Sequence, residues 1–135
     1  MKKRTFIAIL AFTFISALLP LRAQAQSIES MPPVVIKTVP ESGATDVVAG
    51  TVEIKVTFSK KMADNSWSWA TAWQGSAPVG KPRYEADGKT CAMTVKLEPG
   101  KTYAYWINSE KFRNFKDRQG HSSVPYLLVF QTKEK

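Results

Sequence analysis

Apolar and polar side chains alternate strictly over residues 51–58, the clearest pattern in the chain. The apolar row consists of Val52, Ile54, Val56 and Phe58. A period of two puts one row on a buried face and the other in water, whereas a helix would need apolar residues three and four positions apart. The segment is therefore predicted to be a strand with one face in the core.

Residues 90–97 repeat this alternation. Their apolar row consists of Cys91, Met93, Val95 and Leu97. We therefore expect Cys91 to point into the core, where a free thiol is usually inert; the alternative is a reactive thiol or one paired with another chain. Since Cys91 is the single cysteine, an intramolecular disulfide is impossible.

Three further runs have the composition of strands and are bounded by turn residues. They cover residues 34–39, 102–108 and 126–132. Pro40 and Gly43 follow the first run, Pro99 and Gly100 precede the second, and Pro125 precedes the third. After residue 25, helical periodicity is nowhere sustained over three turns. The pattern predicts an all-β chain, folded as a sandwich of short strands.

The N-terminus has the three parts of a secretory signal peptide. Cations at positions 2–4 precede an apolar run over residues 6–19, and small residues follow at Ala23 and Ala25. Because the run is shorter than the roughly 20 residues that cross a bilayer as a helix, we predict cleavage after Ala25 rather than an uncut membrane anchor. The predicted parts are a signal peptide (1–25), a flexible leader without structure of its own (26–33) and one domain (34–135).

Removal of the signal peptide changes the charge balance. The full chain has a net charge of +8, but residues 1–25 hold four basic residues and no acid, which leaves +4 over 110 residues. Nucleic-acid binding requires a dense stripe of basic residues, and a surplus this small argues against nucleic acid as a partner. We expect a periplasmic or extracellular protein that is not inserted into the membrane after cleavage.

Four short motifs follow one another in order along the chain. They are Thr38-x-Pro40-x-x-Gly43-Ala44-Thr45-Asp46-Val47, Val56-Thr57-Phe58-Ser59-Lys60-Lys61-Met62, Leu97-x-Pro99-Gly100-x-x-Tyr103 and Phe130-x-Thr132. Together they resemble the bacterial Ig-like domains of the SbsA type, a family named from surface-layer proteins. The resemblance covers residues 33–132 and implies an immunoglobulin-like β-sandwich of about seven antiparallel strands.

The resemblance also implies structural roles for single residues. Tyr103, with Pro99 and Gly100 before it, looks like a tyrosine corner, in which the tyrosine hydroxyl bonds to the backbone near the preceding turn. Phe130 is implied to be a core residue on the last strand, and Phe58 has the same role at the end of the alternating run.

Two segments are more aromatic or more basic than the resemblance explains. The candidate ligand-binding residues in and beside them are Trp67, Trp69, Trp73, Tyr84, Arg113 and Lys116. Exposed aromatic faces stack on sugar rings or anchor protein partners. The alternative is that tryptophans cover the end of the core and that residues 111–118 form an ordinary solvated loop anchored by Phe112 and Phe115.

The chain displays no group of residues with the spacing of an active site. His121, the only histidine, is expected in a solvated loop, and no nucleophile elbow surrounds a serine. Asp64, Asp87 and Asp117 lie near turn residues and are expected to cap turns. Periplasmic copper-resistance proteins have a similar sandwich, but here the soft-metal ligands are scattered. We therefore predict neither catalytic residues nor a metal site nor a cofactor.

Three functions remain in competition. The first is an exported, non-catalytic binding module that recognises a glycan or protein of the cell envelope through the tryptophan-rich edge. The second is a structural or assembly subunit of the cell envelope that uses its sheet edges for contact. The third is a small hydrolase, which requires a site that the sequence does not display.

Overall fold

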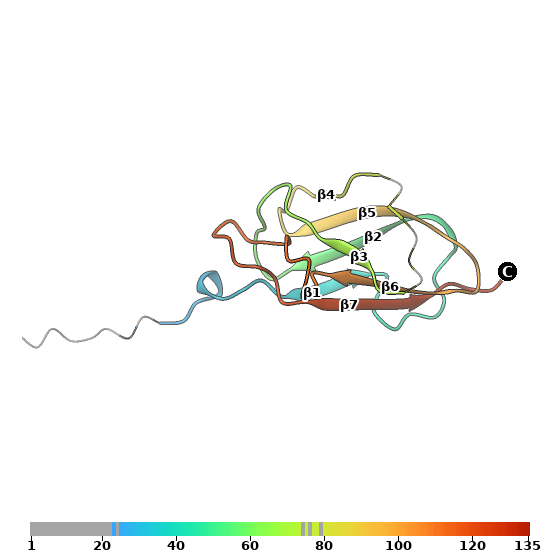
Figure 1. Ribbon diagram of the computed structural model, residues 1–135, viewed down its shortest axis with the longest axis horizontal. Coiled ribbons are helices and arrows are strands. Elements are labelled where there is room, and N and C mark those ends of the chain that lie inside the picture. The colour runs from blue at the N-terminus through green and yellow to red at the C-terminus, as the bar shows by residue number, and fades with distance from the viewer. Residues whose placement is uncertain (1–22, 24, 74, 76, 79) are drawn as a thin grey trace, which may run out of the picture.

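The computed structural model describes residues 23, 25–73, 75, 77, 78 and 80–135. In this part of the chain, seven strands form two antiparallel sheets that lie against each other (Figure 1). In chain order the elements are the 3₁₀ turn η1 (Ile28–Ser30) and the strands β1 (Val35–Val39), β2 (Gly50–Phe58), β3 (Trp69–Thr71), β4 (Arg83–Tyr84), β5 (Thr90–Leu97), β6 (Thr102–Ile107) and β7 (Tyr126–Gln131).

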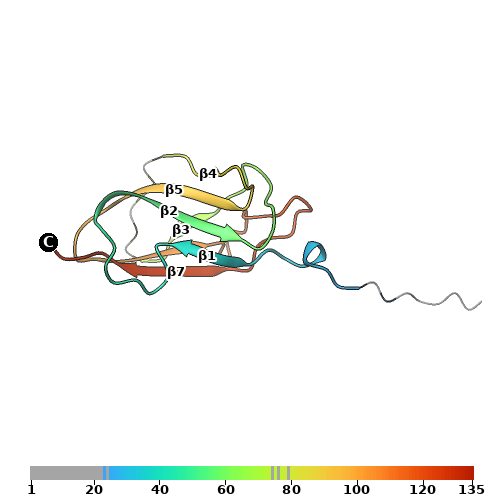
Figure 2. The same ribbon diagram turned by 180° about the vertical axis from the view of Figure 1, so that it is seen from behind.

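The strands are divided between the sheets as in a constant-type immunoglobulin sandwich. One sheet has the order β1-β2-β5-β4 and the other the order β3-β6-β7, and Figures 1 and 2 show the two layers from opposite sides. Four strands facing three, with this connectivity, is the arrangement of that sandwich. The prediction of an all-β immunoglobulin-like fold with about seven antiparallel strands is confirmed.

The two alternating segments form the longest ladder of the molecule. Strands β2 and β5 pair in a register that runs from Gly50 opposite Leu97 to Thr57 opposite Thr90. Ile54 and Val56 are fully buried, as is Cys91 on the facing strand. The prediction that Cys91 points into the core is therefore confirmed, and the sandwich is held without a disulfide.

Aromatic rings fill much of the space between the sheets. The ring of Phe58 lies 5.1 Å from that of Phe115, and Phe130 stacks on Tyr103 at 5.9 Å and on Tyr105 at 6.3 Å. Each of these five side chains is at most 3% exposed. Since a buried aromatic side chain removes roughly 150–250 Å² from water, these rings dominate the hydrophobic stabilisation of the fold.

The first strand segment contributes to both sheets. After pairing with β2, the chain turns at Pro40, and the following residues run beside β7, where Val47 forms a parallel bridge with Thr132. The N–H of Gln131 donates to the carbonyl of Ala44 at 2.8 Å. The early motif around Pro40 therefore marks the place where the chain passes from one sheet to the other.

The turn between β5 and β6 is a tyrosine corner at the end of the sandwich that carries the C-terminus (Figure 1). The N–H of Glu98 donates to the Tyr103 hydroxyl at 2.8 Å, which is the hydrogen bond expected of such a corner. Pro99 is exposed in the turn, and Gly100 has a φ of +66°, in the left-handed region that favours glycine.

The N-terminal region differs from expectation. The predicted signal peptide, residues 1–25, lies almost entirely outside the described residues. The expectation that the leader, residues 26–33, has no structure is wrong, because it contains η1 and Pro33 is buried. Val124 N–H donates to the Pro33 carbonyl at 3.0 Å, so the leader packs on the domain. Across the described residues, none of the helical segments has the length and hydropathy needed to cross a membrane.

Candidate functional site

Two of the three clustered tryptophans face the core. Trp69 pairs with the buried Ile107 and packs against the core, so its side chain points between the sheets, whereas Thr71 at the end of β3 is exposed. Trp69 contacts Phe115 edge to face, with 5.7 Å between ring centroids. The core role that the sequence left open as an alternative fits this position.

Trp67 lies on the same side of the extended segment and packs with Tyr84 of β4. Their ring centroids are 6.4 Å apart, and Lys81 Nζ lies 5.5 Å from the Trp67 ring centroid. The Tyr84 hydroxyl donates to the carbonyl of Ser66 at 2.7 Å, and burial raises the pKa of this phenol. Trp67 and Tyr84 therefore close the flank of the core between β3 and β4.

The remaining candidate residues are exposed and do not gather at one place. Trp73 is 55% exposed after the end of β3. Arg113 and Lys116 are exposed in the loop between β6 and β7. This loop is anchored by Phe115, which is fully buried, but not by Phe112, which is 56% exposed. The expectation that both phenylalanines anchor the loop is therefore wrong for Phe112.

Phe112 stands between two hollows beside the edge strand β3. The first, of about 700 Å³, is lined by Ser68, Trp69, Ala70, Thr71, Gly75, Ala77, Pro78 and Phe112. The second, of about 480 Å³, is lined by Ala70, Thr71, Trp106, Ser109, Glu110, Lys111, Phe112 and Pro125. The second hollow lies on the outer face of the sheet, because Ala70 pairs with Trp106 and both alternate with inward-pointing neighbours.

Gly75 determines the shape of the first hollow. A Cβ atom at this position would lie 2.3 Å from Cγ2 of Thr71 and 3.2 Å from the Tyr105 ring, so the chain approaches β3 as closely as it does only because residue 75 has no side chain.

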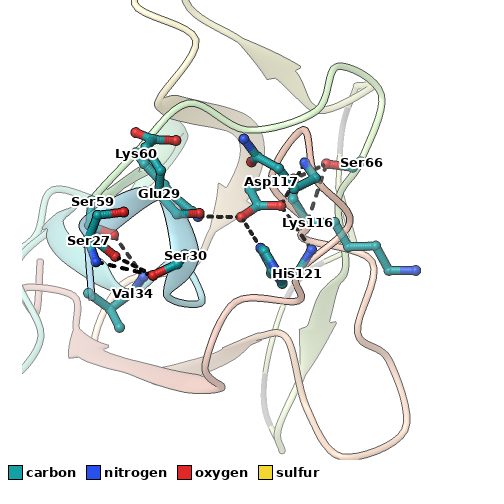
Figure 3. A network of polar contacts seen from close by, with 11 residues as sticks. Ser27, Glu29, Ser30, Val34, Ser59, Lys60, Ser66, Lys116, Asp117 and His121 are labelled. Atoms are coloured by element: carbon teal, nitrogen blue, oxygen red, sulfur yellow. Dashed lines mark hydrogen bonds and ion pairs between the residues drawn. The ribbon is translucent and has the colours of Figure 1, made fainter. Parts of the chain in front are cut away.

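A buried polar network, drawn in Figure 3, lies at the end of the sandwich that carries η1. Lys60 Nζ lies 2.5 Å from Asp117 Oδ2, and the two side chains are only 3% and 0% exposed. The same ammonium group donates to the Glu29 carbonyl at 3.0 Å, which ties η1 to the domain. His121 Nδ1 lies 2.8 Å from Asp117 Oδ2, so one carboxylate oxygen meets two side chains.

The second carboxylate oxygen of Asp117 holds its own loop. It accepts hydrogen bonds from the N–H groups of Gln119 at 2.9 Å and His121 at 2.8 Å. Burial by itself raises the pKa of Asp117, but the hydrogen bonds from Lys60 and His121 outweigh it and hold the pKa at about 2. Asp117 is thus a turn-capping aspartate, as predicted, and in addition a buried anion that the sequence did not reveal.

Asn108 fixes the base of the same loop and was also missed. It is fully buried, and its side-chain amide donates to the carbonyls of Phe115 and Ser123, both at 3.0 Å, while its oxygen accepts from the Phe115 N–H at 2.9 Å. Asn108 belongs to no recognisable sequence motif. Its position just after a strand is the one signal from which its structural role could have been suspected.

The chemistry available to this network is limited. The His121 ring is paired with a carboxylate, but within the described residues no serine hydroxyl forms a hydrogen bond with that ring, as a Ser-His-Asp site requires. Burial raises the pKa of Cys91 to about 11 despite an opposing effect of Trp69, so this thiol is not a thiolate at neutral pH. In the described part of the chain, no three metal-binding side chains of the His, Cys, Asp and Glu types come together.

Comparison with known proteins agrees with the immunoglobulin-like fold described above. A family profile described as "Bacterial Ig-like domain" matches residues 29–132. No curated protein is significantly similar in sequence. A structure of domains 1–6 of the surface layer protein SbsC has 19% identity and a TM-score of 0.52, and the likeness covers 78% of this chain.

The likeness to SbsC concerns the fold. A crystal structure of the S-layer protein rSbsC, residues 31–844, gives 20% identity over 76% of this chain, with a TM-score of 0.49. This chain spans only 14% of the length of either SbsC chain. The family prediction made from the four motifs is confirmed: the chain belongs to the bacterial Ig-like domain family.

Proposed function

We propose that the protein is an exported, non-catalytic binding module of the cell envelope that recognises a glycan on the outer face of the β3-β6-β7 sheet. The observation that carries this proposal is the hollow of about 480 Å³ between Trp106 and Phe112. Its volume is within the range of small-ligand sites, roughly 300–1,000 Å³. Sequence reasoning predicted a binding edge from Trp67 to Trp73, but Trp67 and Trp69 face the core, and the exposed Trp73 does not line this hollow.

The lining of the hollow suits a sugar ring. Phe112 presents an exposed flat apolar face, on which the C–H groups of a sugar can stack, and Trp106 forms a second aromatic wall. Ser109, Glu110 and Lys111 supply a hydroxyl, a carboxylate and an ammonium group beside these rings. A few polar groups on an aromatic surface are what orients a ligand in such a site.

The test is a titration of the protein with soluble peptidoglycan fragments and acidic polysaccharides, followed by tryptophan fluorescence, which Trp106 would report. We expect Phe112→Ala to lower the affinity about tenfold or more, as truncation of an aromatic anchor does. The matched control is Val48→Ala, because Val48 is 67% exposed and lies outside both hollows. The proposal fails if the fluorescence responds to none of these glycans or if Phe112→Ala binds as the wild type does.

A structural or assembly role is the second candidate, and the edge position of β3 favours it. This strand has only three residues, pairs with β6 on one side and includes the exposed Thr71. An edge strand is a template for association with another chain. Sedimentation that shows concentration-dependent association of the wild type, but not of Thr71→Lys, would support this role. A monomer at all concentrations would exclude self-assembly.

A further inference from the structure

Two adjoining hollows lie at the end of the sandwich that carries η1, and both are lined by Ile28 and Ser59 but not by Trp106 or Phe112. The first, of about 490 Å³, lies between η1 and the residues around the ends of β2, β5 and the β6–β7 loop. Its lining residues are Ile28, Glu29, Ser59, Lys60, Lys61, Lys89, Arg118 and Gln119.

This first hollow carries a surplus of positive charge, which is offset in part by Asp87, which interacts electrostatically with Lys89, and by Asp64 and Glu85, which line a neighbouring hollow together with Arg118. Lys60 is neutralised by Asp117 in the buried pair. Lys61, Lys89 and Arg118 converge from three separate segments, and none of them has an ion pair within 4.0 Å among the described residues. Glu29 is the one acidic residue in the lining given above. A concave surface with a cationic lining concentrates field lines and attracts an anion.

The second hollow, of about 870 Å³, is mainly apolar. Its lining residues are Gln26, Ser27, Ile28, Met31, Pro32, Val34, Ser59 and Val124. Four apolar side chains there are exposed to solvent: Ile28 by 67%, Met31 by 50%, Val124 by 49% and Val34 by 42%. Exposed apolar side chains that gather in one place mark a surface for a partner or a lipid, whereas single ones are ordinary.

The segment that supplies these apolar side chains is held in place by the domain. Val34 and Ser59 exchange two hydrogen bonds, from Val34 N to Ser59 Oγ at 3.1 Å and from Ser59 N to the Val34 carbonyl at 2.9 Å. The Lys60 ammonium group binds the carbonyl of Glu29 in η1, as Figure 3 shows. The apolar surface is thus presented by ordered chain and joins the cationic hollow along a common wall.

We propose that this end of the domain binds an anionic amphiphile, with the charged head group in the cationic hollow and the acyl chains on the apolar hollow. A soluble anion would use only the first hollow, and an uncharged apolar partner only the second. An anionic lipid uses both, because its head group and its acyl chains are joined as the two hollows are. The binding is peripheral, on the surface of a bilayer.

The test uses the purified exported protein, whose N-terminus is first determined by mass spectrometry. Co-sedimentation is measured with vesicles of phosphatidylcholine alone and of phosphatidylcholine mixed with phosphatidylglycerol, and inorganic phosphate is titrated separately by NMR. We expect binding to the anionic vesicles that weakens as salt is raised, and little binding to phosphatidylcholine.

Two sets of variants separate the contributions of charge and of apolar surface. The triple variant Lys61→Gln/Lys89→Gln/Arg118→Gln should bind anionic vesicles about 100-fold more weakly, since each cation near an anionic surface contributes roughly a factor of five. Its control has the same net charge and replaces three exposed lysines at the opposite end of the sandwich, where the C-terminus lies: Lys96→Gln/Lys133→Gln/Lys135→Gln. The apolar variant is Ile28→Ser/Met31→Ser/Val124→Ser, and its control replaces exposed apolar residues outside the hollow: Ile36→Ser/Val39→Ser/Val48→Ser.

The outcomes decide between the possible sources of the anion. Loss of vesicle binding in both test variants, with both controls unchanged, supports the proposal. Phosphate binding without vesicle binding would overturn it in favour of a soluble anion. Equal losses in a test variant and its control would also overturn it, because the effect would then follow from net charge or general surface hydrophobicity. Glycan binding by the Phe112 hollow is an independent readout, so either proposal can fail alone.

Discussion

The two ends of the sandwich are both closed by buried polar groups, but the chemistry differs. At the C-terminal end, the neutral hydroxyls of Tyr103 and Thr132 satisfy the turn at residues 98–101: Thr132 donates to the Glu98 carbonyl at 2.6 Å and accepts from the Lys101 N–H at 3.0 Å. At the η1 end, the charged pair of Lys60 and Asp117 has this role.

This difference determines how much each end depends on a single residue. Removal of one neutral partner costs about one hydrogen bond, or the desolvation of one backbone group. Removal of one member of a buried ion pair leaves the other charge in the interior without compensation, which costs several times more. Substitution of one residue at the neutral end should therefore lower the free energy of unfolding only modestly. Loss of either charge at the other end should lower it several times more.

The largest effect should come from Asp117→Asn. The variant leaves the Lys60 ammonium group, 3% exposed, without its counterion, and we expect a loss of about 3–5 kcal/mol in the free energy of unfolding. Denaturant unfolding measures this loss. The control is Lys60→Met/Asp117→Asn, which removes both charges and should recover most of the stability. A loss below about 1 kcal/mol in the single variant would contradict the burial of the pair.

At low pH, protonation of Asp117 should lower the free energy of unfolding by about 2 kcal/mol. The pKa of Asp117 is about 2 in the folded protein, below the value of about 3.9 of an unfolded aspartate. Because the folded pKa is the lower one, this stabilisation is complete above about pH 4 and is lost as the pH falls toward 2. Unfolding of the wild type and of Lys60→Met/Asp117→Asn, compared across this window, isolates the contribution. Parallel pH profiles would show that Asp117 does not cause it.

Tyr103→Phe tests the neutral end and should cost about 1–2 kcal/mol. The substitution keeps the ring in the core but leaves the Glu98 N–H without its hydroxyl partner. We expect the loss to be independent of pH between about 2 and 4, in contrast to the Asp117 contribution. A loss as large as that of Asp117→Asn would remove the distinction drawn between the two ends.

The smallest effect is expected for His121→Gln, below about 1 kcal/mol. The His121 side chain is 42% exposed, and Asp117 keeps its contacts with Lys60 and with two backbone N–H groups when the ring is removed. Thermal unfolding at neutral pH measures the change. A destabilisation comparable to that of Asp117→Asn would show that the ring, rather than Lys60, compensates the buried carboxylate.

Local patterns in the sequence determined one of the two ends and five of the seven strands in the described part of the chain, but not the short strands β3 and β4. The alternation over residues 51–58 and 90–97 specifies which face of β2 and β5 is buried, since side chains on a strand repeat with a period of two. The tyrosine corner is readable because Pro99, Gly100 and Tyr103 lie within five positions of one another. In the same way, the turn-capping role of Asp117 was readable from its immediate neighbours.

Only the tertiary structure determined which groups these side chains contact. Lys60 and Asp117 are separated by 56 intervening residues, and His121 looked like a solvated loop residue, so the buried network carried no local signal. The same holds for the tryptophans: Trp67 and Trp69 are two positions apart and so share a face of an extended segment, but whether that face meets solvent or the core depends on the pairing of β3 with β6. Periodicity specifies how side chains are arranged within an element, whereas burial and charge pairing arise only when elements distant in sequence are brought together.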